Sequence, residues 1–493
     1  MEYNNYSAIS FEVDGIVYLY DRFSNEFIEI DKDVEKVLST TDNAIQNDLI
    51  KDLQDNFDIL RPFKVDKLSI SGSKTTLEKI HSKIDGHVSK LVFSTTENCN
   101  LRCKYCVYSG EYYGSVREHN NNNLLWRVAQ QAVDLFLSVS KNSTDRYISF
   151  YGGEALLNYS LIEKIVNYTK EKNREIKFGI VTNLVVLTDK IAKFLVDNEF
   201  AISVSLDGPE TIHDLYRLTK NEKKTHKAVI KNLKMLRSLD EENFLKKIIF
   251  NILIVPHKYN LNILDEYFSS DLFKDIPLES FKVLQLNYED NGFFEKYDYQ
   301  DFIKRFNKFS IDKFFNALTS NKTDFSDMRI SYNYNIKPYK RIYFREMNRM
   351  TDYSFFWPNG ICIPGLRSIF VSTNGKIYPC EKMYDHNSLI IGDVFVGMNL
   401  NQIATIIDEY CKKSLNTCSN CWAFRFCEQC YLNSRKGDQY SNEKHQQSCE
   451  TTKKSMLFYF KNYLSIINKN PNAFEHLDQN EQSLRSYDMI LDD

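Results

Sequence analysis

Three cysteines stand close together near residue 100 of this chain, in the segment CNLRCKYC. Cys99, Cys103 and Cys106 have the spacing C-x3-C-x2-C, one thiolate short of the four that a closed tetrahedral metal site uses. Thiolate sulfur is a preferred ligand of cluster iron. Three thiolates on one tight loop can therefore hold three irons of a [4Fe–4S] cube and leave the fourth iron with an open position.

Composition supports iron ligation over disulfide bonding. The chain has 493 residues and 11 cysteines, with a net charge of -3. We find no signal peptide and no apolar run of about 18 residues, so we expect a cytoplasmic protein that does not enter a membrane. An odd number of cysteines there favours metal or cluster ligation. The small net charge gives no reason to expect a nucleic-acid partner.

The residues around the cysteine triad alternate between short apolar strands and longer helical patterns. This alternation over residues 86–290 predicts an α/β domain with a parallel sheet and right-handed crossovers. Ligands of such sheets bind at the carboxyl ends of the strands. The triad follows the first predicted strand, GGE the second and TN the third. The predicted strands are KLVFSTT, DRYISFYGG, KFGIVTN, FAISVSLDG, KIIFNILIVP and SFKVLQLN.

The triad, with Tyr105 before its last cysteine, resembles the signature of the radical S-adenosylmethionine enzymes. The resemblance implies a partial (β/α)6 barrel over residues 86–290. It also implies a [4Fe–4S] cluster whose open iron binds S-adenosylmethionine, which releases a 5′-deoxyadenosyl radical on reduction. One departure is TNL at residues 182–184, where TNG is commoner, and we expect it to change only the shape of the loop.

Two further segments resemble cofactor-binding motifs of this family, SFYGGEALLN and SVSLDGPETIHDLYR. The resemblance implies that Glu154 accepts a hydrogen bond from the methionyl ammonium and that Ser205 contacts the ribose. Arg217 would pair with the methionyl carboxylate, which a guanidinium fork matches well. The full set of expected cofactor contacts is Tyr108, Gly152, Gly153, Glu154, Ser205, Arg217 and Leu253.

The cysteine-rich residues 356–455 resemble the SPASM domain, which carries two auxiliary [4Fe–4S] clusters. The resemblance implies Cys362, Cys380 and Cys430 for the first cluster. It implies Cys418, Cys421, Cys427 and Cys449 for the second. The two residues between Cys427 and Cys430 are one fewer than usual, and the gap from Cys362 to Cys380 is slightly long. Zinc is an alternative occupant. Cys411 is either unligated or a fourth ligand that closes the first cluster, which otherwise has an open iron.

Residues 1–85 form a separate predicted module of three strands followed by helices, with Asp31 and Asn43 as helix N-caps. This order resembles the PqqD-like peptide recognition element, a winged-helix-like fold. The resemblance implies that a leader peptide adds a strand at its third strand, around residues 27–30. Residues 291–355 are expected to be a bridging helical region, and residues 456–493 a C-terminal tail.

Together these resemblances imply a maturase of a ribosomally made, cysteine-containing precursor peptide, with thioether formation as in sactipeptide or ranthipeptide maturases. A flavodoxin or ferredoxin would supply electrons. One alternative is formylglycine formation, as in anaerobic sulfatase maturases, in which Glu381 would replace a catalytic Asp. Peptide epimerisation and carbon–carbon crosslinking are also compatible with the motifs. A non-catalytic, metal-bound peptide-binding scaffold is the alternative from a different class.

Overall fold

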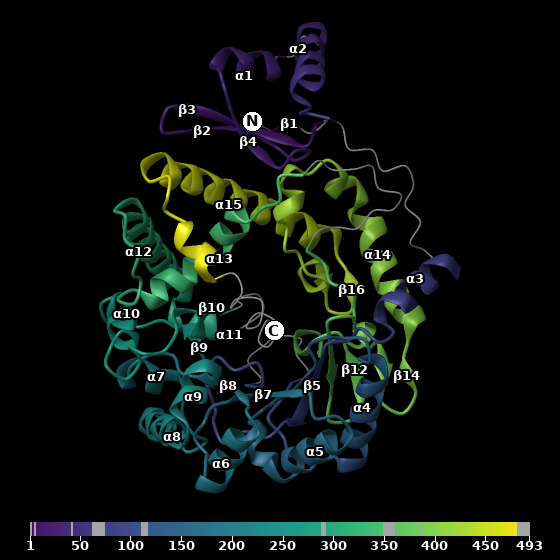
Figure 1. Cartoon of the computed structure of the whole chain (residues 1–493), viewed down its shortest axis with the longest axis vertical. Helices are drawn as coiled ribbons and strands as arrows, with labels where there is room; N and C mark the ends of the chain where they lie inside the picture. The colour runs from purple at the N-terminus through teal and green to yellow at the C-terminus, as the bar shows by residue number, and fades with distance from the viewer. Residues whose placement is uncertain are drawn as a thin grey trace.

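The computed structural model describes residues 2–3, 6–40, 43–61, 74–109, 117–286, 292–348, 360–384 and 386–480. The first strands of the chain form an antiparallel sheet in the order β1-β2-β3-β4, at the top of Figure 1. The three predicted strands and two helices are present, and β1 is an addition that its two residues did not reveal. The elements are β1 (Glu2–Tyr3), β2 (Ala8–Val13), β3 (Ile16–Asp21), β4 (Glu26–Ile30), α1 (Lys32–Leu38) and α2 (Asn43–Phe57).

The six strands predicted between residues 86 and 290 form one parallel array in the order β10-β9-β8-β7-β6-β5. The apolar runs of β5 to β9 are mostly buried, as expected for strands covered on both faces, whereas the edge strand β10 is only partly buried after Phe281. The array does not close on itself in the described chain, because β5 pairs with β11 instead of β10. The strands are β5 (Lys90–Thr96), β6 (Tyr147–Gly152), β7 (Lys177–Thr182), β8 (Ala201–Ser205), β9 (Ile248–Ile254) and β10 (Phe281–Gln285).

Helices connect these strands, and their apolar faces pack on the sheet (Figure 1). Four of them match the helical patterns of the sequence within about two residues, whereas α7, α9 and α10 were not predicted. The helices are α4 (Trp126–Val139), α5 (Tyr159–Lys172), α6 (Asp189–Asp197), α7 (Glu210–Tyr216), α8 (His226–Leu239), α9 (Glu241–Lys247) and α10 (Ile263–Phe268).

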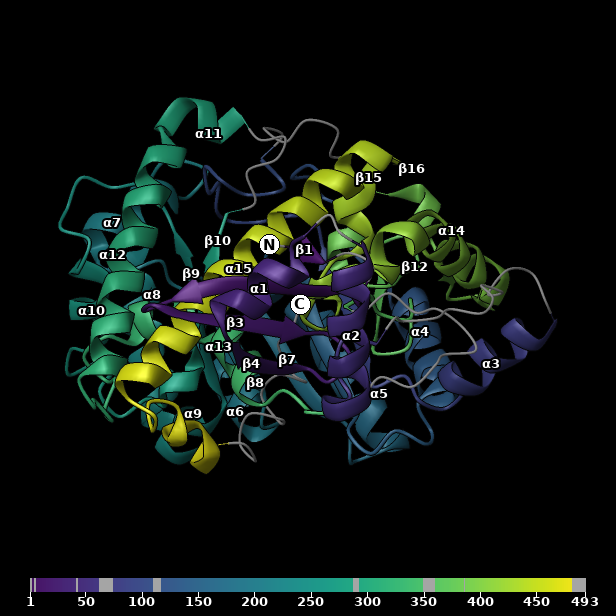
Figure 2. The same cartoon turned by 90° about the horizontal axis from the view of Figure 1, so that it is seen from above.

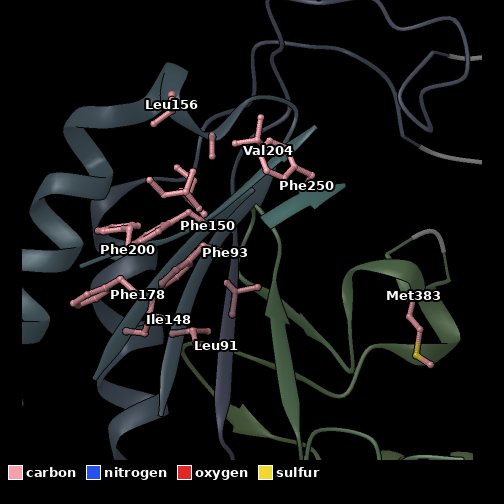
Figure 3. Close-up of a cluster of buried hydrophobic side chains, with 14 of the residues drawn as sticks. Leu91, Phe93, Ile148, Phe150, Leu156, Phe178, Phe200, Val204, Phe250 and Met383 are labelled. Atoms are coloured by element: carbon pink, nitrogen blue, oxygen red, sulfur yellow. The ribbon is translucent and has the colours of Figure 1, made fainter. Parts of the chain in front are cut away.

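Aromatic rings form much of the core beside strands β5 to β7. Figure 3 shows Phe93, Phe150, Phe178 and Phe200 beside one another at these strands. The ring centroids of Phe93 and Phe150 are 6.1 Å apart, and those of Phe178 and Phe200 are 5.6 Å apart, both pairs nearly parallel. All four side chains are buried. This packing fixes the relative height of the strands whose carboxyl ends carry the predicted motifs.

The cysteine-rich domain extends the same sheet. Strand β11 pairs in parallel with β5, and β12, β13 and β14 continue from it in antiparallel order. The first barrel strand is therefore shared between the two domains. These later elements are β11 (Ser368–Val371), β12 (Lys376–Tyr378), β13 (Gly392–Asp393), β14 (Gly397–Met398), α14 (Leu400–Ser419), β15 (Arg435–Lys436) and β16 (Gln439–Tyr440).

The predicted bridging region is helical, as α11 (Gly292–Tyr297), α12 (Tyr299–Thr319) and α13 (Arg329–Tyr343). Two predicted boundaries fall inside packed structure. Helix α3 (Lys74–Ile84) packs on α14, away from β1–β4. Helix α15 (Asn442–Lys469) runs without a break through the boundary at 455/456. Among the described residues no helix is long and apolar enough to span a membrane.

An aromatic cluster joins the N-terminal sheet to α15 and the cysteine-rich domain, and Figure 2 shows the sheet lying over α15. Phe460 of α15 is fully buried at its centre. Its ring centroid is 4.9 Å from that of Tyr20, 4.8 Å from that of Phe27 and 5.7 Å from that of Trp422. The N-terminal sheet is thus packed into the body of the protein.

Replacing Phe460 with Ala is expected to destabilise the protein by about 3 to 5 kcal/mol, because it removes a buried ring from three packed elements. Phe458→Ala is the matched control, since the Phe458 side chain on the same helix is 47% exposed. Thermal unfolding of both variants measures the difference. Equal unfolding temperatures for the two variants would contradict the assigned role of Phe460.

Candidate active site

The cysteine triad lies on the loop that follows β5, at the carboxyl end of the parallel array. Backbone N–H groups point at two of its sulfurs: Leu101 donates to Sγ of Cys99 at 3.4 Å, and Tyr108 donates to Sγ of Cys106 at 3.5 Å. The side-chain amide of Asn183 lies 3.7 Å from Sγ of Cys99. Such N–H donors stabilise thiolate charge and tune a bound cluster.

The three thiols are buried close enough to influence one another. Burial raises the pKa of Cys103 to about 12, with the Arg217 charge opposing this and the Cys106 and Cys99 charges adding to it. Burial likewise raises the pKa of Cys99 to about 12. Without a metal the thiols are therefore protonated at neutral pH, so ligand binding must release their protons.

The chemistry of the triad suits a cluster, because thiolate sulfur is a preferred ligand of cluster iron. Among the described residues, no three Cys, His, Asp or Glu side chains form a group that could hold a single metal ion. Beside Cys106, moreover, two buried polar atoms have no hydrogen-bond partner among the described residues, Oη of Tyr108 and Nε of Arg217. Their burial without partners fits a polar cofactor at this position.

The glycines of GGE hold the cysteine loop in place. A Cβ on Gly152 would lie 2.3 Å from the carbonyl oxygen of Thr96, and one on Gly153 would lie 2.2 Å from that of Asn98. The N–H of Gly153 donates to that Thr96 oxygen at 2.8 Å, and the N–H of Glu154 donates to the Asn98 oxygen at 2.9 Å. The atoms that these two glycines closely approach belong to the end of β5 and to the loop before Cys99, and their contact with the cofactor stays a prediction.

Glu154 is buried and is already engaged by three donors. Its Oε1 accepts from Oγ1 of Thr182 at 2.7 Å and from the N–H of Leu156 at 3.1 Å, and its Oε2 accepts from the N–H of Asn183 at 2.7 Å. Burial raises the pKa of Glu154, while these hydrogen bonds favour the charged form. A carboxylate has about four acceptor sites, so one is left for a cofactor ammonium.

In the TNL segment, Leu184 stands where glycine is commoner. Leu184 has a φ of 58°, in the left-handed region where glycine is favoured. Its side chain is fully buried, and its carbonyl oxygen accepts from Nδ2 of Asn232 at 2.7 Å. Burial of the leucine offsets a backbone cost of about 1 to 2 kcal/mol. The segment thus keeps the turn that glycine would otherwise make.

Arg217 is held by two residues whose roles the sequence did not predict. Its Nη1 donates to Oη of Tyr105 at 2.7 Å and lies 3.8 Å from Oδ1 of Asp207. Tyr105 in turn donates to Oδ2 of Asp207. Burial raises the pKa of Asp207, and the Arg217 charge and the Tyr105 hydrogen bond oppose this. Asp207 stands within the SLDGP segment, but no local pattern pairs it with Arg217.

The remaining predicted cofactor contacts lie on neighbouring strands. Ser205 ends β8 and is half-buried, and Leu253 lies in β9, where its N–H donates to Oδ1 of Asp207 at 3.3 Å. Tyr108 is buried, and its ring stacks on His119 with centroids 5.7 Å apart. Burial lowers the pKa of His119 to about 4, so its ring is neutral at pH 7. His119 was not predicted from sequence.

The C-terminal cysteines fall into the two predicted sets. Cys362, Cys380 and Cys430 lie near one another, since burial raises the pKa of Cys380 and the Cys430 and Cys362 charges raise it further. Glu381 is buried directly after Cys380, beside the Cys430 thiol. Ligation of iron by this set stays a prediction.

The second set is grouped in the same way. Burial raises the pKa of Cys418, and the neighbouring Cys421, Cys449 and Cys427 charges raise it further. Cys411 is buried in α14, where burial and the Asp408 charge raise its pKa to about 12. Its surroundings favour the unligated alternative.

Glu97 connects the triad loop to the cysteine-rich domain. Its Oε2 accepts from Nδ2 of Asn120 at 2.5 Å and of Asn122 at 2.9 Å, and its Oε1 accepts from Thr373 at 3.0 Å and Tyr384 at 2.6 Å. Although burial opposes ionisation, these hydrogen bonds hold the pKa of Glu97 below its usual value. A polar cavity of about 640 Å³ opens here, lined by Glu97, Arg117, Asn120, Asn122, Thr373 and Tyr384.

Comparison with known proteins identifies the barrel. Residues 93–265 match the Radical SAM superfamily. A cysteine-type anaerobic sulfatase-maturating enzyme of Clostridium novyi is 29% identical over 209 residues, 40% of this chain and 50% of that protein. The radical SAM cyclopropyl synthase TigE of Paramaledivibacter caminithermalis is 26% identical over 322 residues, 57% of this chain and 66% of that protein. The chain thus spans between half and two thirds of the length of these relatives.

The fold comparison covers more of the molecule. A solved structure of native anSMEcpe with bound AdoMet has a TM-score of 0.55 and 21% identity, covering 78% of this chain and 99% of that chain. Residues 93–265 thus form a radical SAM domain, and over part of its length the chain is related to proteins named as sulfatase-maturating enzymes and as a cyclopropyl synthase. That family implies a [4Fe–4S] cluster and S-adenosylmethionine, which the triad and the unpartnered atoms of Tyr108 and Arg217 fit.

Replacing Gly153 with Ala is expected to displace the triad loop and to lower iron content by about four atoms per chain, because the added Cβ would collide with the Asn98 carbonyl. Gly437→Ala is the control, because a Cβ on Gly437 meets no atom within 4 Å even though its φ of 59° is positive. Iron and sulfide analysis after anaerobic reconstitution gives the comparison. Full iron content in Gly153→Ala would show that the close approach is not needed.

Proposed function

We propose that this protein is a maturase that joins a cysteine sulfur to a carbon of a ribosomally made precursor peptide. The observation that carries the proposal is the set Cys362, Cys380 and Cys430, grouped in the domain that shares β5 with the barrel. A cluster held by three protein thiolates has a position for a fourth, and a peptide cysteine is a suitable ligand. In this proposal Cys411, which is buried in α14 beside Asp408, stays unligated and leaves that position open.

The residues of the barrel would bind the cofactor and keep water from it. Arg217, oriented by Tyr105 and Asp207, would bind the carboxylate of S-adenosylmethionine, and the fourth acceptor site of Glu154 would take its ammonium. Bound at the reduced cluster, S-adenosylmethionine supplies a 5′-deoxyadenosyl radical that abstracts a hydrogen atom. The polar cavity at Glu97 lies where the barrel meets the cysteine-rich domain and suits the entry of a peptide.

The second candidate is formylglycine formation, which the names of the sulfatase-maturating relatives favour. Glu381 stands directly after Cys380, where that reaction is expected to use an Asp as a base. Its burial beside Cys380 and Cys430 is compatible with proton transfer at that site. The two reactions differ in their products, so mass spectrometry separates them.

The reduced holoenzyme, with S-adenosylmethionine and the cysteine-containing peptide encoded nearest to this chain, is expected to release 5′-deoxyadenosine. The peptide should lose two hydrogens and one alkylatable thiol, as a new thioether requires. Arg217→Ala should lower 5′-deoxyadenosine release at least about tenfold by removing the carboxylate partner. Exchange of the cysteine sulfur for oxygen together with the loss of two hydrogens would establish formylglycine formation instead.

The N-terminal sheet supplies the proposed site for the leader peptide. Strand β4 is an edge strand of the described sheet, with β3 as its neighbour on one side. An edge of this kind accepts an added strand through backbone hydrogen bonds. A flavodoxin or ferredoxin is the proposed electron donor.

Addition of the leader peptide is expected to slow hydrogen exchange of the β4 amides, residues 26–30, because the added strand would take up their free edge. Strand β1 (Glu2–Tyr3), at the opposite edge, is the internal control and should exchange at an unchanged rate. Mass spectrometry of the full chain with and without leader measures both. Protection at β1 alone, or at neither strand, would rule out β4 as the leader site.

A further inference from the structure

One arginine of the N-terminal sheet is buried against residues 418–427 of the cysteine-rich domain, which we call the ligand loop. Arg22 follows β3 and is 1% exposed. Its Nη1 donates to the carbonyl oxygens of Cys418 at 3.1 Å, Ser419 at 2.7 Å and Cys421 at 3.2 Å. The guanidinium carbon lies 4.2 Å from the ring centroid of Phe424. A positive charge from one module is thereby held against the backbone of two cysteines of another.

The Arg22 charge lies beside two of the four cysteines that are expected to hold the second auxiliary cluster. Cys418 and Cys421 both belong to this set, and two of the three carbonyls that Arg22 binds are their own. Adding one electron to a cluster adds one negative charge to this buried region. A nearby cation stabilises the reduced form more than the oxidised form, and the effect is large where water is excluded. Burial of the whole guanidinium satisfies that condition.

A second arginine, Arg425, lies at the same interface and makes different hydrogen bonds. Arg425 of the ligand loop donates from Nε to the carbonyl oxygen of Arg22 at 2.8 Å and from Nη2 to that of Phe23 at 3.0 Å. It also donates to Asn348 at 2.7 Å. Arg425 therefore fastens the loop to the N-terminal sheet through the backbone of Arg22 and Phe23. Both arginines carry a charge, but Arg22 is fully buried and Arg425 is half-buried, so solvent screens the charge of Arg425 more.

We propose that Arg22 is a positioning residue that raises the reduction potential of the cluster held by Cys418, Cys421, Cys427 and Cys449. The inference rests on the auxiliary cluster of the proposed function. It makes the N-terminal sheet part of the redox centre as well as the proposed leader site. Removing the whole module would strip this charge and the Tyr20 ring from the cluster domain. Point variants are therefore needed to distinguish leader binding from cluster tuning.

The test is a redox titration of the anaerobically reconstituted full-length protein, followed by electron paramagnetic resonance. Arg22→Gln and Arg22→Met should make reduction of one cluster about tenfold less favourable, about 59 mV for one electron. Arg22→Lys, which keeps the charge, should stay near the wild-type potential. Arg425→Gln, which removes docking hydrogen bonds and a half-buried charge but keeps the buried Arg22 charge, should shift the potential much less than Arg22→Gln.

Several outcomes would overturn the inference. These are an unmoved potential in both neutral Arg22 variants, equal shifts in Arg22→Gln and Arg425→Gln, or a Lys variant that behaves like Gln. Loss of the cluster from both neutral variants in folded protein would also overturn it, because Arg22 would then have a structural role. If the Cys418→Ser variant has the same iron content as the wild type, the auxiliary cluster itself is absent. That result contradicts the proposed cofactor set first, and the inference with it.

Discussion

The close backbone contact between the ends of β5 and β6 is the constraint on which the site depends. Gly152 and Gly153 lie against the carbonyls of Thr96 and Asn98, with no space for a side chain between them. The same contact orders Glu154, whose carboxylate then binds Thr182 and Asn183 at the end of β7. Three adjacent strand ends are thereby tied together, and the Cys99 loop starts from this contact. A rigid start matters because three thiols must be placed before a cluster can bind them.

The sheet itself explains why the cysteine-rich domain stays in register with the barrel. Strand β5 pairs with β6 on one side and with β11 on the other, so one strand carries both neighbours. Glu97, directly after β5, adds hydrogen bonds to Thr373 and Tyr384 of the second domain. The distance between the triad and the Cys362, Cys380 and Cys430 set is therefore governed by regular structure, which moves less than a flexible linker would.

Local patterns predicted much of this arrangement. The strand at residues 90–96 and the other five of the array have continuous apolar runs, and such runs are buried whatever their neighbours. The position of α3 on α14 and the pairing of β11 with β5 were not predicted, because both depend on partners hundreds of residues away. Helix α15 crossed the expected boundary because it starts at the Ser441 N-cap and continues through its polar residues before residue 456. Those residues also contact Gln429, Ser434 and the N-terminal sheet.

The sequence by itself determined the chemistry that the protein can support. The ligands and charges of the site are indicated by the cysteine spacing, the GGE glycines and the Arg217 segment. Few other residue types could supply the same local chemistry at these positions. The tertiary structure decided which groups face each other: Arg217 with Tyr105 and Asp207, Glu97 with Tyr384, and Arg22 with the Cys418 loop. Buried charges of this kind are stable only beside partners that satisfy them. Folding alone brings such partners together, so no pattern within one segment reveals them.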